Sequence, residues 1–168
     1  MEKKSKKRIF GILLIVLLVL LDQLTKELAV ILLKGKESFV ILKNVFELQY
    51  LENTGAAFSM LEGKTIFFLI LTVVIVLVAA VVYFKTPLEK RFFWFRATLV
   101  LLIAGAIGNF IDRMVNGYVV DFFYFKLINF PVFNVADIYV TAAELLLIVL
   151  VLFYYQSEDF EEIFHGKK

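Results

Sequence analysis

The sequence predicts an all-α integral membrane protein, with four transmembrane helices and a small β-sheet on the outer side of the membrane. Of the 168 residues, 61% are hydrophobic, and the mean hydropathy is +0.86, whereas soluble domains are about 45–50% apolar. A soluble chain of this length would leave roughly 30% of its unfolded surface exposed, so it could not bury so much apolar surface. These observations exclude a soluble enzyme, a DNA-binding module and a disordered chain.

The first apolar segment, residues 9–33, follows a cluster of five cations within residues 3–8. Cations followed by a short apolar run are also typical of a secretory signal peptide. No small-x-small cleavage site follows, because Leu21, Asp22 and Gln23 lead directly into a second apolar run. We therefore interpret the segment as a retained helix and keep the signal peptide as the alternative.

Three further segments are long enough to cross about 30 Å of hydrocarbon, which takes about 20 residues. Residues 66–84 carry no charge, and residues 92–111 carry only Arg96, near their start. Residues 138–155 contain a single acid, Glu144. We predict a transmembrane helix in each.

The distribution of Lys and Arg predicts the orientation, because cytoplasmic loops are enriched in these residues. Residues 3–8 and the loop at 85–91 are strongly basic, whereas residues 34–64 balance four Lys against four Glu. We expect both termini and the 85–91 loop in the cytoplasm, with outer segments at 34–64 and 112–137. Residues 156–168 are interpreted as a solvated polar tail on the cytoplasmic side, and the whole chain as one domain.

The outer segments contain a strand pattern and an aromatic stretch. Residues 46–50 alternate apolar and polar side chains, which indicates a half-buried strand. We therefore expect a small outer sheet that includes residues 38–51. The amphipathic, aromatic stretch 117–131 is predicted to be a mobile element that closes over a site.

Polar side chains gather at the outer ends of the spans and in the outer connections. Polar and ionisable groups at membrane depth are costly and are usually retained for a function. The chain has no Cys and a single His, in the polar tail, which excludes thiolate sites and His-based metal or catalytic sites in the membrane. The residues of this polar layer are Asp22, Asn53, Asn109, Asp112, Arg113, Asp121, Asn134 and Asp137.

Several of these residues have structural interpretations. Asp22 and Lys26 are spaced i, i+4, which lets them form a self-neutralised pair on one helical face. Asp112 stands beside Arg113 at a helix end and predicts a second ion pair, while Asn134 predicts an N-cap for the fourth span.

Small and acidic residues complete this part of the pattern. Asn53 to Gly55 is typical of a turn, and Ala104 with Gly108 is typical of a helix-packing face. Glu144 falls on the same helical face as Asp137, as a possible buried partner for a cation, and its role stays open.

Asp121 and Asp137 differ from the other acids because neither has a neighbouring cation in the sequence, and both stand among apolar residues. If they come within a few ångströms, burial and like-charge repulsion would make them share one proton, as in an aspartic-protease dyad. One would then act as general base on a water molecule and the other as general acid. The alternatives are two acids that cap helix ends, or a proton relay in a transporter.

Five sequence blocks closely resemble the lipoprotein signal peptidase family of bacteria, also called signal peptidase II, in the order found there. The resemblance covers nearly the whole chain and its four spans. The blocks are Asp22-Gln23-Leu24-Thr25-Lys26, Asn53-Thr54-Gly55-Ala56-Ala57-Phe58-Ser59, the stretch 105–113 (GAIGNFIDR), Gly117-Tyr118-Val119-Val120-Asp121-Phe122 and Phe133-Asn134-Val135-Ala136-Asp137.

This resemblance implies a multi-pass aspartic peptidase of the bacterial cytoplasmic membrane, with its active site near the outer face. Its substrates would be prolipoproteins that carry a diacylglyceryl group on the lipobox cysteine, cut just before that cysteine. The family's catalytic aspartates match Asp121 and Asp137. Its supporting residues match Asp22, Lys26, Asn53, Gly55, Asn109, Asp112, Arg113, Asn134 and Ala136.

The resemblance also implies the partners of the protein. Besides prolipoproteins, these are membrane lipids and the inhibitor globomycin, which would occupy the same cleft. We expect a monomer without metal or cofactor that does not bind nucleic acid.

The alternative from another class is a small four-span transporter or channel component, with Asp121 and Asp137 as proton or cation sites. Such proteins place their acids near the midplane and often show inverted repeats. Here the acids cluster toward one side, and no repeat is convincing. A non-catalytic membrane scaffold is a third hypothesis, and it predicts that both carboxylates tolerate conversion to amides.

Overall fold

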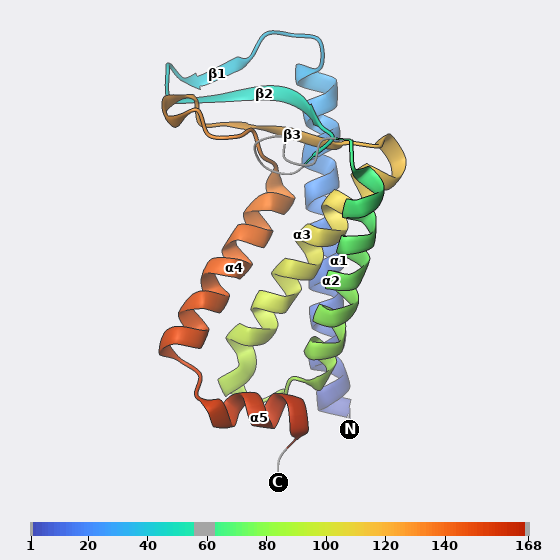
Figure 1. Ribbon diagram of the computed structural model, residues 1–168, viewed down its shortest axis with the longest axis vertical. Helices are drawn as coiled ribbons and strands as arrows, with labels where there is room; N and C mark the ends of the chain where they lie inside the picture. The colour runs from blue at the N-terminus through green and yellow to red at the C-terminus, as the bar shows by residue number, and fades with distance from the viewer. Residues whose placement is uncertain (1, 56–62, 167–168) are drawn as a thin grey trace.

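The computed structural model describes residues 2–55 and 63–166. Four long helices run side by side, a small sheet covers one end of the bundle, and a short helix lies across the other (Figure 1). The long helices are α1 (Glu2–Leu33), α2 (Thr65–Lys85), α3 (Phe93–Asn116) and α4 (Val135–Phe153). All four are long and apolar enough to cross a membrane, as predicted. Residues 56–62, which include positions 56–59 of the second sequence block, lie outside the described residues.

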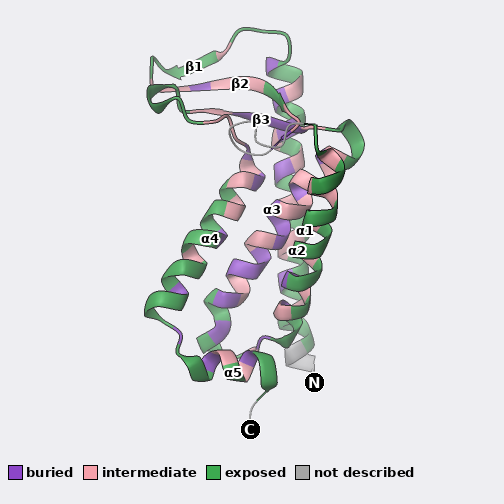
Figure 2. Cartoon of the chain, viewed as in Figure 1, coloured by how far each residue is buried: buried purple, intermediate pink, exposed green. Residues whose placement is uncertain are grey.

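Helix α3 is the centre of the bundle and packs against α1, α2 and α4. Its buried residues are spread along its length, whereas α2 and α4 are mostly exposed in the absence of lipid (Figure 2). Small residues allow the close packing, because Ala104, Gly105 and Gly108 are all buried on α3. The predicted packing face is therefore confirmed.

Several helix ends differ from the predicted boundaries, and local chemistry explains two of them, the end of α3 and the start of α4. Helix α3 continues past residue 111 to Asn116, and it ends where Gly117 adopts a left-handed conformation with φ +83°. Helix α4 begins at Val135 rather than at 138, because the Asn134 side chain caps it by accepting a hydrogen bond from the Asp137 N–H. The predicted N-cap is thus confirmed.

The sheet has three antiparallel strands in the order β1 (Phe39–Leu42), β2 (Phe46–Asn53) and β3 (Val119–Tyr124). The strand predicted around residues 46–50 is confirmed as part of β2. Strand β3 lies within the stretch expected to be mobile, so residues 119–124 are hydrogen-bonded to a neighbouring strand. Movement of the wider 117–131 stretch stays a prediction.

The tail after α4 does not simply extend into solvent. Helix α5 (Ser157–His165) lies across the end of the bundle near the 3-10 turn η2 (Lys90–Phe92) (Figure 1). The side chain of Ile163 is only 2% exposed, and the Asp159 carboxylate binds the Arg91 guanidinium. This packing was not predicted, because the polar residues around Ile163 conceal a narrow apolar face.

Candidate active site

Asp121 lies on β3, at the point where the sheet meets the helices. Its residue is 1% exposed, and both carboxylate oxygens accept hydrogen bonds. Asn53 of β2 donates to Oδ2 at 2.8 Å, and Asn134 donates to Oδ1 at 2.6 Å. In the register of β2 and β3, Leu51 pairs with Asp121 and Asn53 pairs with Val119. Asn53 and Asp121 are therefore diagonal neighbours on adjacent strands, close enough for their side chains to meet.

Asp137 lies in the first turn of α4, where the helix cap holds it. The Asn134 side chain accepts from the Asp137 N–H at 3.0 Å, and the Asp137 Oδ2 accepts from the Asn134 N–H at 3.1 Å. This reciprocal arrangement is a capping box. It leaves Oδ1, which accepts a hydrogen bond of 2.7 Å from Asn109 of α3.

Two asparagines link the carboxylates of Asp121 and Asp137. The Asn134 amide that donates to Asp121 also donates to Asn109 Oδ1 at 3.1 Å. Asn109 in turn donates to Asp137 through its own amide nitrogen. The two aspartates predicted to act together therefore belong to one hydrogen-bonded network built from β3, α3 and α4.

A buried ammonium group lies behind this network. Lys26 of α1 donates to Asn109 Oδ1 at 2.9 Å and forms ion pairs with Asp22 at 2.9 Å and Asp112 at 3.2 Å. The predicted i, i+4 pair of Asp22 and Lys26 is therefore confirmed. Two acids around one ammonium satisfy the charge of a lysine that is almost fully buried.

The predicted ion pair between Asp112 and Arg113 is wrong. Adjacent residues on a helix point in different directions, and Asp112 faces Lys26 while its Oδ2 also accepts from the Val120 N–H at 3.0 Å. Arg113 points toward the cavity instead and donates to the Gly55 carbonyl at 2.9 Å. Its guanidinium carbon lies 4.9 Å from the centroid of the Phe68 ring, within cation–π range.

Helices α1, α3 and α4 approach closely at one glycine. A Cβ atom added to Gly108 would lie 2.5 Å from Asp22 Oδ2, so a larger residue has no room there. The other oxygen of Asp22 accepts from the Ala136 N–H at 2.8 Å. This contact explains why Ala136, beside Asp137, belongs with the predicted supporting residues.

Burial sets the protonation behaviour of Asp121. Removal of the carboxyl group from water raises its pKa to about 7, and the nearby Asp137 charge acts in the same direction. The hydrogen bonds from Asn53 and Asn134 oppose this rise because they favour the charged form. Asp121 is therefore able to hold or release a proton near neutral pH.

A cavity of about 860 Å³ opens in front of the two aspartates. Helices α2, α3 and α4 contribute its walls, and the loop at 130–133 and the sheet contribute its top. Asn53, Asn109 and Arg113 line it together with Asp121 and Asp137. Most of the lining is apolar, with a few convergent polar groups, as in binding sites for small molecules and peptides.

Glu144 lines the same cavity two helical turns along α4 from Asp137. It is exposed, so it is not the buried partner for a cation that the sequence suggested as an option. Thr141 and Leu145 lie on either side of it along the cavity wall. Within residues 2–55 and 63–166, no cluster of three or more acids and histidines is arranged to hold a metal ion.

All eleven residues predicted for the site lie in this layer, where the sheet meets the helices. One further member, Gln23, was not among them. Its amide nitrogen donates to Asp112 at 2.9 Å, to the Gly108 carbonyl at 3.1 Å and to Asp22 at 3.2 Å. Its position next to Asp22 in the first sequence block was the available signal. The asparagine turn is also confirmed, because the Asn53 side chain accepts from the Gly55 N–H at 2.9 Å.

The chain is similar to known proteins over most of its length. Residues 14–153 match the family described as signal peptidase (SPase) II. The lipoprotein signal peptidase of Streptococcus pneumoniae is 41% identical over 88% of this chain and 95% of that protein. The lipoprotein signal peptidase of Caldanaerobacter subterraneus subsp. tengcongensis is 43% identical over 85% of this chain and 96% of that protein.

Two solved structures, each described as a bacterial membrane enzyme, share the fold. One is 33% identical, covers 95% of this chain and 92% of its own, and superimposes with a TM-score of 0.73. The other is 36% identical, covers 87% of this chain and 94% of its own, and has a TM-score of 0.74. None of these similarities supports a transporter.

Proposed function

The chain belongs to the signal peptidase II family, and we propose that Asp121 and Asp137 are its catalytic pair. The protein is a multi-pass membrane peptidase that removes the signal peptide from prolipoproteins whose lipobox cysteine carries a diacylglyceryl group. The observation that supports the proposal is the asparagine-linked pair of buried aspartates in the wall of an open cavity.

The reaction needs one protonated and one ionised carboxyl group. The ionised aspartate takes a proton from a water molecule, and the resulting hydroxide attacks the carbonyl carbon of the peptide bond. The protonated aspartate donates its proton to the nitrogen of the lipidated cysteine as the C–N bond breaks. With a pKa of about 7, Asp121 exchanges a proton readily at neutral pH, which suits either role.

The surrounding amides hold both carboxyl groups in position. Asn53 and Asn134 bind the two oxygens of Asp121, and Asn109 binds Asp137. Lys26 lies behind Asn109 and donates to its side-chain oxygen, so it orients the amide that binds Asp137. These side chains come from rigid helices and strands, which keeps the geometry ready before the substrate arrives.

The cavity suits a lipid-anchored peptide. Its apolar walls on α2 and α4 offer a surface for the signal peptide and for acyl chains, while its polar end holds the scissile bond beside Asp121. Arg113, at the same end, is placed to bind a peptide carbonyl, as it binds the Gly55 carbonyl here. The inhibitor globomycin would occupy the same cavity and compete with the substrate.

The proposal includes the setting of the enzyme. The basic clusters support an orientation with both termini and the 85–91 loop in the cytoplasm, and with the sheet and active site at the outer face of the bacterial cytoplasmic membrane. A diacylglyceryl cysteine sits at that depth, with its acyl chains in the leaflet and its peptide bond at the rim. The enzyme would act as a monomer surrounded by membrane lipids.

The test is cleavage of a diacylglyceryl-modified prolipoprotein in detergent micelles, read as a gel shift. Wild type is compared with Asp121→Asn and Asp137→Asn, and thermal unfolding verifies that each variant is folded. Both folded variants are expected to be inactive. Near-full activity in either one would overturn the two-carboxylate mechanism, and the exposed Glu144→Gln provides a matched loss of charge in the same cavity.

A further inference from the structure

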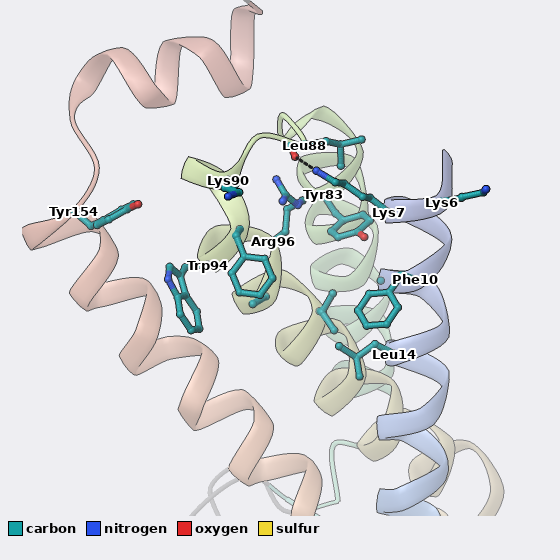
Figure 3. Close-up of a pocket in the computed structure, with 14 residues that line it drawn as sticks. Lys6, Lys7, Phe10, Leu14, Tyr83, Leu88, Lys90, Trp94, Arg96 and Tyr154 are labelled. Atoms are coloured by element: carbon teal, nitrogen blue, oxygen red, sulfur yellow. Dashed lines mark hydrogen bonds between the residues drawn. The ribbon is translucent and has the colours of Figure 1, made fainter. Parts of the chain in front are cut away.

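A second cavity lies at the opposite end of the bundle, far from the aspartates. Its volume is about 680 Å³, and it is lined by the start of α1, by Tyr83 of α2, by residues 88–100 in part, and by Tyr154, which follows α4. Figure 3 shows Phe10 and Leu14 of α1 nearer the middle of the bundle, with Lys7 and Arg96 nearer the end of the bundle where α1 begins. The volume lies within the roughly 300–1,000 Å³ of pockets that bind small molecules.

The end of this cavity nearest the start of α1 is positively charged. Lys7 of α1, Lys90 of η2 and Arg96 of α3 all line it, and the described residues of its lining include no acid. Lys7 donates to the Leu88 carbonyl at 3.1 Å, and Arg96 donates to the carbonyl of Pro87. Carbonyl groups are neutral, so these hydrogen bonds fix the two cations in place without cancelling their charge.

The inner part of the cavity is apolar and open to the membrane. Phe10 is 67% exposed and Trp94 is 51% exposed in the absence of lipid, so both present apolar surface that a lipid would cover. Trp94 and Tyr154 also line the cavity close to the charged rim. Trp and Tyr are enriched at the level of lipid headgroups, which indicates that the cavity extends from the headgroup region into the acyl-chain region.

We propose that this cavity binds a glycerophospholipid with a negatively charged headgroup. Its phosphate would contact Lys7, Lys90 and Arg96, and an acyl chain would lie along Phe10 and Leu14. Charge complementarity favours this occupant over a zwitterionic lipid, because basic pockets between transmembrane helices bind anionic headgroups. The site is separate from the catalytic cavity, so the proposal does not depend on the roles of the aspartates.

The only Trp of the chain makes the proposal directly testable. Trp94 fluorescence of the purified protein is titrated in micelles with phosphatidylglycerol or phosphatidylcholine that carries bromine on its acyl chains, because bromine quenches Trp at contact. Half-maximal quenching is expected at a several-fold lower fraction of the anionic lipid. Equal fractions for the two lipids would overturn the proposal.

Matched variants separate a binding site from general attraction to a charged surface. Lys90→Gln is expected to raise the required fraction of anionic lipid about fivefold, the contribution of one cation. Lys85→Gln removes the same charge at the same end of the bundle but outside the cavity lining, and it should change the fraction by less than twofold. Equal effects of the two variants would overturn the site. Lys7→Gln retains an amide donor for Leu88 and repeats the test independently, and thermal unfolding without added lipid verifies folding.

Discussion

The Asp22 carboxylate accepts a hydrogen bond of 2.8 Å from the backbone N–H of Ala136, a residue 114 positions away in the sequence. This bond joins α1 to the first turn of α4, next to Asp137. The other Asp22 oxygen binds Lys26 at 2.9 Å. One buried side chain therefore holds two helices together and also positions the ammonium group behind the proposed catalytic pair.

Asp22→Ala is expected to lower the thermal stability strongly. Loss of the carboxylate leaves the buried Ala136 N–H without its acceptor, which costs about 1–3 kcal/mol, whereas Lys26 keeps Asp112 as a partner. The measurement is the Tm in detergent. Glu52→Gln is the control, since it breaks an exposed ion pair with Lys34 and should leave the Tm almost unchanged. Equal shifts in the two variants would contradict the structural role of Asp22.

Gly108→Ala tests the close approach of α3 to Asp22. The added Cβ would lie 2.5 Å from Asp22 Oδ2, and overpacking of this kind costs about 1–3 kcal/mol. The expected result is a lower Tm, and the double variant Gly108→Ala/Asp22→Ala should lose less stability than the two single variants added together, because the clash is then gone. Strictly additive effects in this cycle would show that the two positions do not touch.

Two substitutions of Asn134 separate its role in the helix cap from its role at Asp121. Asn134→Ser keeps a good N-cap residue but is too short to reach the Asp121 carboxylate, so kcat should fall while the Tm falls less than in Asn134→Ala. Asn134→Ala loses the cap as well and should cost about 1 kcal/mol more in stability. If Asn134→Ser keeps the wild-type kcat, the contact between Asn134 and Asp121 does not contribute to catalysis.

The raised pKa of Asp121 predicts a dependence of stability on pH. The folded state keeps its proton up to a pH of about 7, whereas the unfolded state loses it near the ordinary value of 3.8. Between these values the folded state binds more protons, so the contribution of Asp121 to stability falls as the pH rises. Tm values measured from pH 4 to 8 should show Asp121→Asn gaining stability relative to wild type with increasing pH. A constant difference would contradict the buried environment of Asp121.

Much of the fold could be predicted because each span has a strong local signal. The uncharged run in α2 and the cap at Asn134 are properties of neighbouring residues, and both were identified correctly. The strand β3 was missed because its residues, 119–124, are almost all apolar and lack the alternation that indicates a half-buried strand. Its pairing with β2 depends on residues about 70 positions away.

The site illustrates the same limit at the level of single side chains. The layer of polar residues could be located from topology, because polar groups at membrane depth stand out in an apolar sequence. The contacts that these residues make with one another within the layer could not be predicted from the sequence. Asp112 pairs with Lys26 of another helix rather than with its neighbour Arg113, and Gln23 bridges Asp112 to the Gly108 carbonyl. Such choices depend on the angles at which helices pack.

The most direct test of the central claim, that Asp121 and Asp137 act as one unit, is a double-mutant cycle on kcat/KM. Cleavage of a lipid-modified prolipoprotein is measured for Asp121→Asn, Asp137→Asn and the double variant, each verified as folded. General acid–base groups contribute roughly 10²–10⁴-fold, so each single variant should lose about that much. If the two residues act together, the kcat/KM of the double variant is no lower than that of the less active single variant. Losses that multiply, or a single variant with wild-type kcat/KM, would contradict the account.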